Sequence, residues 1–350
     1  MKKLVLERRE LKQNIMSIKT KTKGALLYAD LAADAWGAGL MELAAILRDE
    51  GISRFAVSEL EEAEALRRAG FFEEEILMLR SITDRRELDR LVDLGVVYTI
   101  GTYDSGVALN AAAEARSTVL EAHLRIDMSM GTGGFLMDDM EKILSMYQYL
   151  PSVAITGIYT QFRGDKNNEP AEVQVRAFQQ LLDKIRNAGY ETGIVHTSEV
   201  WKKGSGGDKG AIRVGSAFLG RGRRTKKDGL KKVGYGEVNL EEPRWLPQGY
   251  IVGEESHEEL RNALRVASIS IGYQNGLGVA FQKEESFWER LFRKREQPVF
   301  RINNQRVSVV GGIGARETVL DVTRVKCNVG DIVNFEIDPL YAKGLEREYR

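Results

Sequence analysis

The chain has 350 residues, of which 43% are hydrophobic and 29% are charged, and its 51 basic side chains balance 51 acidic ones. This balance gives no basic excess that would indicate binding to nucleic acid or to an anionic membrane surface. The length is sufficient for two domains, and a single cysteine, Cys327, excludes an internal disulfide framework and favours a reducing compartment.

Targeting signals are not expected in this sequence. No apolar stretch approaches the ~20 residues that a membrane-spanning helix needs. The N-terminal segment MKKLVLERRELKQ reaches charged residues too early for a secretory signal. We therefore expect a cytoplasmic protein that binds neither nucleic acid nor a membrane.

The first two thirds of the chain alternate short apolar runs with amphipathic helical patterns. About eight such repeats predict parallel strands closed into a (β/α)8 barrel. A doubly wound sheet is the alternative, although no G-x-G-x-x-G turn follows the first strand. The expected strands are 25–31, 54–57, 76–79, 97–100, 121–126, 155–160, 194–196 and 211–214. The expected helices include 41–49, 59–69, 84–94, 103–115, 140–150 and 171–188.

Beyond residue 224 the pattern changes to short β-rich runs separated by glycine-rich turns, which indicates a mostly antiparallel β domain. We therefore expect a barrel domain over 1–224 and a β domain over 225–350. The runs are 266–273, 300–302, 307–310, 318–322 and 332–337, with a charged helical stretch at 284–297.

Several sequence blocks follow one another along the whole chain, among them DAWGAGL (34–40), FAVSELEEAEALRRAG (55–70), RIDMSMG (125–131), RVGSAFLG (213–220), VVGGIGARETVLDVT (309–323) and VGDIVNFEIDPLY (329–341). In sequence and in order these blocks resemble those of alanine racemases, and the C-terminal blocks resemble the clostridial-type branch of that family. The resemblance implies the barrel and β domain of fold type III pyridoxal-phosphate enzymes.

Racemisation on pyridoxal phosphate requires a lysine that forms an imine with the cofactor and a tyrosine that moves the second proton. By the resemblance, the lysine belongs four residues before Trp36, and the sequence has Ala32 there. The tyrosine position corresponds to Glu254. A methyl group forms no imine, so we expect neither covalent cofactor binding nor racemisation of alanine.

The family's phosphate cradle is also altered. The serine that follows His-Thr-Ala-Asn in relatives corresponds to Val200, and the asparagine before it corresponds to Glu199. A carboxylate beside a phosphate is repulsive, by about 3 kcal/mol per charge pair at ~5 Å. Gly215 and Ser216 still offer backbone amides to an anion. On these residues we expect that no cofactor is bound.

Other family positions are partly changed and partly retained. By the resemblance, the usual arginine after the I-D motif is Thr132, the cofactor-facing histidine is Gln161, and the often carbamylated lysine is Arg125. Arg213 keeps the position that faces the pyridine nitrogen; a buried ion pair with Glu199 is the alternative. Aromatic positions near the ligand are retained as Tyr273 and Tyr349, which could also simply pack.

Three functions are consistent with these residues. The first is a cofactor-free binding or regulatory pseudoenzyme with a small molecule in the barrel mouth. The second is an enzyme with carboxylate acid–base chemistry acting on a small amino-acid-like molecule, using Glu199, Glu254, Glu255, Asp34, Arg213 and Gln161. The third is an active amino-acid racemase. The resemblance also implies a head-to-tail homodimer, and no metal site is expected.

Overall fold

The structure is a computed structural model that describes residues 1–350 except 129, 163–171, 199–209, 222–227, 254–258 and 282–296. Its contacts divide the chain into two compact units. The first, Lys12–Lys231, we call the barrel unit. The second combines Met1–Leu11 with Lys232–Arg350, and we call it the β unit. Nearly all of the expected helix at 284–297 lies outside the described residues.

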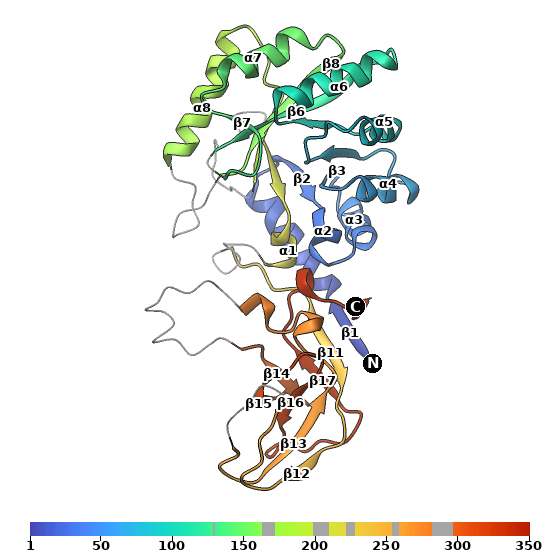
Figure 1. Ribbon diagram of the computed structural model, residues 1–350, viewed down its shortest axis with the longest axis vertical. Helices are drawn as coiled ribbons and strands as arrows, with labels where there is room; N and C mark the ends of the chain where they lie inside the picture. The colour runs from blue at the N-terminus through green and yellow to red at the C-terminus, as the bar shows by residue number, and fades with distance from the viewer. Residues whose placement is uncertain (129, 163–171, 199–209, 222–227, 254–258, 282–296) are drawn as a thin grey trace. The chain divides into compact units, whose positions relative to one another are not determined.

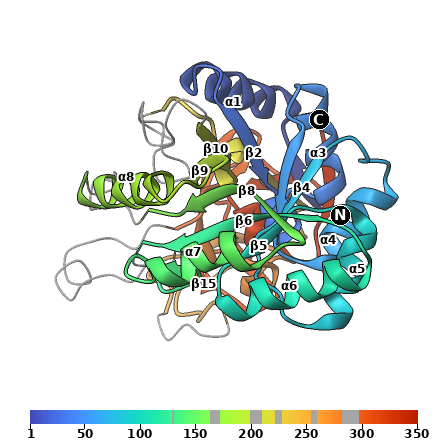
Figure 2. The same cartoon turned by 90° about the horizontal axis from the view of Figure 1, so that it is seen from above.

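The barrel unit contains eight parallel strands in the order β4-β3-β2-β10-β9-β8-β6-β5. A parallel bridge between Leu77 and Val97 links the two ends of this order and nearly closes the ring. Helices α3 to α8 lie on the outside of the strands, as the two views of this unit show (Figures 1 and 2). The predicted (β/α)8 barrel is therefore confirmed, and the doubly wound alternative is wrong.

All of the strands and helices expected for the barrel unit lie within a few residues of observed ones, and four further elements were not expected: Arg8–Lys21, Ala32–Trp36, Phe135–Leu136 and Ser216–Leu219. The strands are β2 Leu26–Asp30, β3 Arg54–Val57, β4 Glu75–Met78, β5 Tyr98–Ile100, β6 Leu120–Asp127, β7 Phe135–Leu136, β8 Val153–Thr160, β9 Ile194–Ser198 and β10 Gly210–Val214. The helices are α1 Arg8–Lys21, α2 Ala32–Trp36, α3 Leu40–Asp49, α4 Leu60–Arg68, α5 Arg85–Leu94, α6 Tyr103–Ala115, α7 Met140–Tyr149, α8 Glu172–Asn187 and η1 Ser216–Leu219.

Local sequence explains where several of these helices begin. Asp84 precedes α5 and accepts a hydrogen bond from the Glu87 backbone N–H at 3.0 Å. Thr102 precedes α6, and its hydroxyl accepts a bond from the Ser105 N–H at 3.1 Å. Such caps satisfy backbone donors that have no partner within the helix. Each cap lies just after a strand, so it also fixes the loop at the carboxyl end of that strand.

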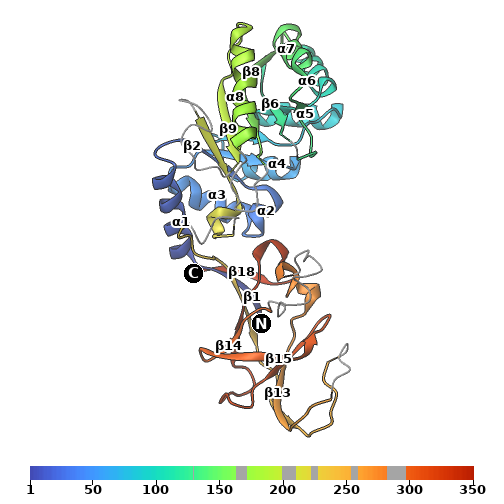
Figure 3. The same ribbon diagram turned by 90° about the vertical axis from the view of Figure 1, so that its left-hand side faces the viewer.

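The β unit contains a nine-stranded sheet in the order β12-β13-β16-β15-β14-β17-β11-β1-β18. All of its neighbouring strands pair antiparallel except β1 and β18, which are parallel. Figure 3 shows β1 and β18 beside each other. The predicted mostly antiparallel domain is therefore confirmed.

The elements of the β unit are β1 Lys2–Leu6, β11 Tyr235–Asn239, β12 Arg244–Leu246, β13 Leu264–Ile269, η2 Tyr273–Asn275, η3 Val279–Phe281, β14 Phe300–Ile302, β15 Gln305–Ile313, β16 Thr318–Asp321, β17 Ile332–Phe335, η4 Pro339–Tyr341 and β18 Glu346–Tyr349.

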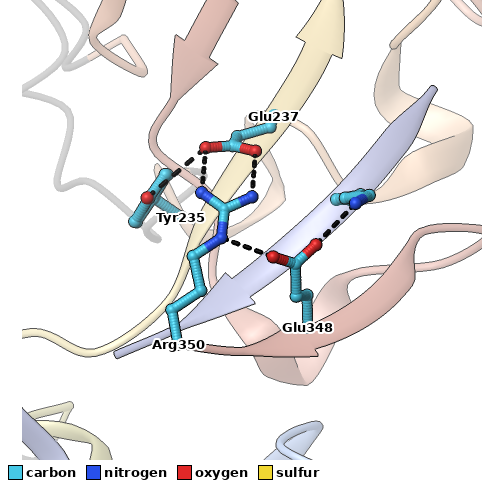
Figure 4. Close-up of polar contacts among 5 residues, drawn as sticks. Tyr235, Glu237, Glu348 and Arg350 are labelled. Carbon is cyan, nitrogen blue, oxygen red and sulfur yellow. Dashed lines mark hydrogen bonds and ion pairs between the residues drawn. The ribbon is translucent and has the colours of Figure 1, made fainter. Parts of the chain in front are cut away.

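A buried carboxylate joins strands of the β unit that are far apart in sequence. Glu237 is 4% exposed and accepts two hydrogen bonds from the Arg350 guanidinium, each at 2.7 Å (Figure 4). Arg350 Nε also donates to Glu348, which in turn accepts from Lys3 Nζ. A bidentate guanidinium–carboxylate pair satisfies both groups at once. This network connects β11, β18 and β1.

The division of the chain corrects the expected domain boundary at the N-terminus. The sequence predicts one domain over 1–224, but β1 pairs with β11 and β18 and belongs to the β unit. Its apolar Leu4, Val5 and Leu6 are buried. The expected boundary at 224 falls in 222–227, outside the described residues. Among the described residues, no helix is long and apolar enough to cross a membrane.

Candidate active site

A cavity of about 620 Å³ lies at the carboxyl ends of the barrel strands. In (β/α)8 barrels the loops at this end of the strands form the active site. The lining residues come from the ends of β2, β3, β4, β5, β6, β8 and β10 and from the turns that follow them. They are Asp30, Ser58, Glu59, Leu79, Arg80, Ser81, Thr102, Arg125, Met130, Thr132, Gly133, Gly134, Tyr159, Gln161 and Arg213.

The chain leaves β2 through a left-handed turn at the edge of this cavity. Ala33, Asp34, Ala35 and Trp36 all have φ between 54° and 57°. Each such residue costs roughly 1–2 kcal/mol when it carries a side chain, so surrounding bonds must hold the turn. The Asp34 carboxylate accepts from the Leu40 N–H at 2.9 Å, and the Asp34 N–H donates to Glu62 at 3.2 Å.

Ala32 immediately precedes this strained turn. Its backbone N–H donates to the Asp30 carboxylate at 3.3 Å, and its side chain is a methyl group. The backbone conformation is therefore that of a residue held in place, while the side chain offers neither an amine nor a proton.

Trp36 ends the same turn and covers Gly215. The indole N–H donates to the Asp30 backbone carbonyl at 3.1 Å. A Cβ atom placed on Gly215 would lie 2.5 Å from the indole nitrogen, so only glycine permits this close approach. The indole therefore occupies the space above Gly215. Ser216 follows at the start of the short helix η1.

Arg213 and Asp30 form an ion pair within the cavity. Arg213 Nε lies 3.5 Å from Asp30 Oδ2, and the two side chains are 5% and 17% exposed. Burial raises the pKa of Asp30, and the Arg213 guanidinium opposes that rise. From the sequence, Glu199 was the alternative ion-pair partner for Arg213. In the structure Arg213 forms an ion pair with Asp30. Glu199 lies outside the described residues.

Two N–H groups of Arg213 have no hydrogen-bond acceptor among the described residues. Its Nε and Nη1 atoms are buried and find no hydrogen-bond partner among the residues that the structure describes. The guanidinium lies over the Tyr159 ring, 5.1 Å from the ring centroid. Buried N–H groups without a partner are costly, so this guanidinium is suited to a ligand that supplies an acceptor.

An aromatic and imidazole stack continues from Tyr159 into the barrel interior. The His196 ring stacks on Tyr159 with centroids 4.6 Å apart and on Tyr28 with centroids 4.9 Å apart. His196 Nε2 lies 3.0 Å from His123 Nδ1. Burial lowers the pKa of His123 to about 3 and that of His196 well below its usual value. Both imidazoles are therefore neutral near pH 7.

Only some of the candidate site residues named from the sequence line the cavity. Arg213 and Gln161 line the cavity, as do Arg125 and Thr132. Trp36, Gly215 and Ser216 lie beside one another at the left-handed turn and η1. Tyr273 and Tyr349 belong to the β unit. The Asp34 carboxylate caps α3, and it does not line the cavity. Glu199, Val200, Glu254 and Glu255 lie outside the described residues.

The family model for the alanine racemase N-terminal domain matches residues 6–200. The chain belongs to the alanine racemase family. Alanine racemases from Clostridium novyi and Carboxydothermus hydrogenoformans are 26% and 25% identical to it; each alignment covers 92% of this chain and 81% or 85% of the relative. The solved alanine racemase of Clostridium difficile 630 has a TM-score of 0.85 at 19% identity, covering 100% of this chain and 95% of that one.

The comparisons correct the expectation that no cofactor is bound. A solved alanine racemase from Bartonella henselae, with a TM-score of 0.83 at 19% identity over 100% of this chain and 99% of that one, carries covalently bound pyridoxal phosphate. Membership of this family makes cofactor binding the default, and the substitutions at Ala32 and around it do not overturn that. A cofactor can be held by hydrogen bonds and charge without a covalent bond, so the loss of an imine-forming lysine does not by itself mean that the cofactor is lost.

Arg213 in this cavity fits such a cofactor, whereas Ala32, at the start of the neighbouring helix α2, does not. The buried Arg213 guanidinium, with two N–H positions lacking partners among the described residues, suits a ring nitrogen or an oxyanion. Ala32 has no amine to link to it. The fit is therefore to a molecule held by hydrogen bonds and charge.

Proposed function

We propose that this chain is a binding or regulatory member of the alanine racemase family. It holds pyridoxal phosphate, or a similar anionic molecule, without a covalent bond, and it does not racemise alanine. The observation that carries the proposal is Ala32, whose backbone is fixed by the Asp30 bond and the left-handed turn, and whose methyl side chain cannot form an imine.

The cavity supports the binding part of this proposal. It is large enough for a small molecule, since ligand pockets usually enclose about 300–1,000 Å³. Arg213 supplies buried donors, and Arg125 supplies a second cation in the same cavity. A pocket with a few convergent polar groups on a rigid barrel is the usual form of a binding site.

Restoring the amine tests this proposal directly. We expect the natural chain to bind pyridoxal phosphate reversibly, with no adduct after borohydride reduction and no D-alanine from L-alanine in chiral chromatography. Ala32→Lys should give a borohydride-trapped adduct at residue 32 in peptide mass spectrometry. Ala33→Lys, one residue further along the same turn, is the matched control and should give none.

Two results would overturn the proposal. One is D-alanine above the level of a no-protein control with the natural chain, which would establish the third candidate, an active racemase. The other is a borohydride-trapped adduct on a different lysine at a stoichiometry near one per chain.

A second candidate is an enzyme that uses carboxylate acid–base chemistry on a small amino-acid-like molecule. The Asp30–Arg213 pair favours it, because it places a buried carboxyl group, whose pKa burial raises, beside a guanidinium in the cavity. Exchange of the Cα hydrogen of amino acids in D₂O, followed by NMR, would detect this activity. Its abolition by Asp30→Asn would support the enzyme over the binding protein.

We also propose a head-to-tail homodimer in the cytoplasm. The β unit is retained together with the barrel unit across alignments that cover 92% of the chain, which supports a retained assembly. The single cysteine supports a reducing compartment. Light scattering should give twice the 39.3 kDa chain mass; a monomer at micromolar concentration would contradict the dimer.

A further inference from the structure

Two arginines of the cavity stand on either side of a fully buried tyrosine. Tyr159 lies on β8, and its hydroxyl bonds to Thr99 at 3.0 Å and to the Leu79 carbonyl at 3.3 Å. Arg125 is its register partner on the neighbouring strand β6. Arg213 lies on β10, two strands away on the other side. All three side chains line the cavity.

The positive charge of Arg125 is not compensated by a carboxylate of the described chain. Its Nη2 donates to the Thr132 hydroxyl at 2.9 Å, and no acidic group among the described residues lies within ion-pair distance of it. The third cavity arginine differs: Arg80 lies 3.0 Å from Glu87 and 3.6 Å from Glu59. Arg125 is therefore available to an anionic ligand.

Arg213 provides the second anchoring point. Asp30 lies on its Nε side at 3.5 Å, which orients the guanidinium over Tyr159. Nε and Nη1 still lack a hydrogen-bond partner among the described residues.

The positions of the Arg125 and Arg213 guanidiniums determine which kind of ligand can contact both of them. From β6 to β10 there are three strand spacings, on the order of 14 Å along the barrel wall, and less between side chains that converge on its mouth. The Arg125 guanidinium is held at the turn after β6, by Thr132 and beside Gly133, whereas the Arg213 guanidinium faces Asp30 on β2. Because the two guanidiniums are held at different places in the cavity, a short chain with an anionic group at each end would give each of them its own partner.

We propose that this cavity selects a ligand with two carboxylates, one bound by Arg125 and the Thr132 hydroxyl and the other by Arg213. The ligand class is a short dicarboxylate, including acidic amino acids. This inference deepens the proposed function and rests on it, because it names what the same cavity binds. Tyr159 acts here as a positioning residue for the Arg213 guanidinium.

Calorimetric titration of the full chain with matched acids tests the inference. Glutarate and valerate have the same number of carbons and differ in one carboxylate. We expect glutarate to bind at least about 10-fold more tightly than valerate, the scale of one charge-assisted pair. Glutarate should also compete with pyridoxal phosphate.

Substitution of Arg125 identifies the group responsible. Arg125→Gln should reduce glutarate affinity to that of valerate and leave valerate binding within about 3-fold, because the single carboxylate still has Arg213. Arg125→Lys keeps the charge and should retain part of the preference. Arg176→Gln, an exposed arginine on α8, is the matched control, and a thermal melt of each variant checks folding.

The outcomes separate this inference from the proposed function. If pyridoxal phosphate binds but glutarate binds no better than valerate, or if folded Arg125→Gln keeps the preference, the dicarboxylate site is wrong and the proposed function stands. If neither pyridoxal phosphate nor either acid binds the natural chain, both are wrong.

Discussion

Asp30 Oδ2 lies 3.5 Å from Arg213 Nε, and the pair joins two adjacent barrel strands at the cavity. The strands β2 and β10 run in parallel register there, with Arg213 opposite Tyr28. Either ion alone would be costly to bury, because removing a charge from water is only offset by a partner. The pair therefore lets this chain keep a guanidinium in the cavity.

The first prediction concerns the coupling of these two side chains. Asp30→Asn leaves the Arg213 cation without its carboxylate, and Arg213→Gln leaves the Asp30 anion alone. We expect each variant to lower the free energy of unfolding by about 3–5 kcal/mol, as when one partner of a buried pair is removed. The double variant should lose much less than the sum of the two, because no lone charge remains.

Urea unfolding of the natural chain, both single variants and the double variant measures this coupling. Arg176→Gln on the exposed face of α8 is a control that should change the free energy by less than about 0.5 kcal/mol. Losses that simply add in the double variant would show that the two side chains do not stabilise each other.

Most of the architecture could be predicted because it depends on local pattern. The alternation of apolar runs with amphipathic stretches located the eight strands of the barrel ring to within a few residues, and it missed only the two-residue strand β7. The strand β1 was missed for a physical reason: its partners β11 and β18 lie more than 200 residues further along the chain, so its pairing leaves no local signal. As a consequence, the N-terminal segment was assigned to the barrel domain, whereas its contacts place Met1–Leu11 in the β unit.

The cavity shows the limits of sequence reasoning more clearly. Asp30 was overlooked, although one acidic residue ending the apolar run LLYAD of a barrel strand is a detectable sign of a site residue. The bond from Arg125 to Thr132 could not be foreseen, because it depends on the turn over 131–134, where three glycines have positive φ. Matching this sequence to the family's motifs shows which family residues are replaced, but it does not show which new contacts the replacing residues make.

The second prediction concerns the left-handed turn. Ala33 is exposed and has a φ of 55°, a conformation that glycine adopts without steric cost. Ala33→Gly should stabilise the chain by about 0.5–1 kcal/mol, because relief of the left-handed strain exceeds the added freedom of the unfolded chain. Ala111→Gly, at an exposed position within α6, should destabilise it by about 1 kcal/mol. Equal losses for both variants in chemical unfolding would refute the strained turn.

The third prediction concerns the pH dependence that the buried histidine pair imposes. The pKa of His123 falls from 6.5 to about 3 on folding, and that of His196 falls well below its usual value, both chiefly because burial disfavours the charged ring. The unfolded chain therefore binds more protons than the folded chain between these values. The stability contributed by the neutral pair is fully present above pH 6.5 and is lost as the pH falls toward 3.

Each histidine should contribute a slope of about 1.4 kcal/mol per pH unit to the free energy of unfolding once the pH is well below 6.5. Urea titrations at several pH values between 6.5 and 5 keep most carboxyl groups ionised and so isolate this term. His123→Asn removes one of the two buried imidazoles and retains a polar side chain, so the slope should fall by about one histidine's share. An unchanged slope in that variant would mean that the pair is not the origin of the acid sensitivity.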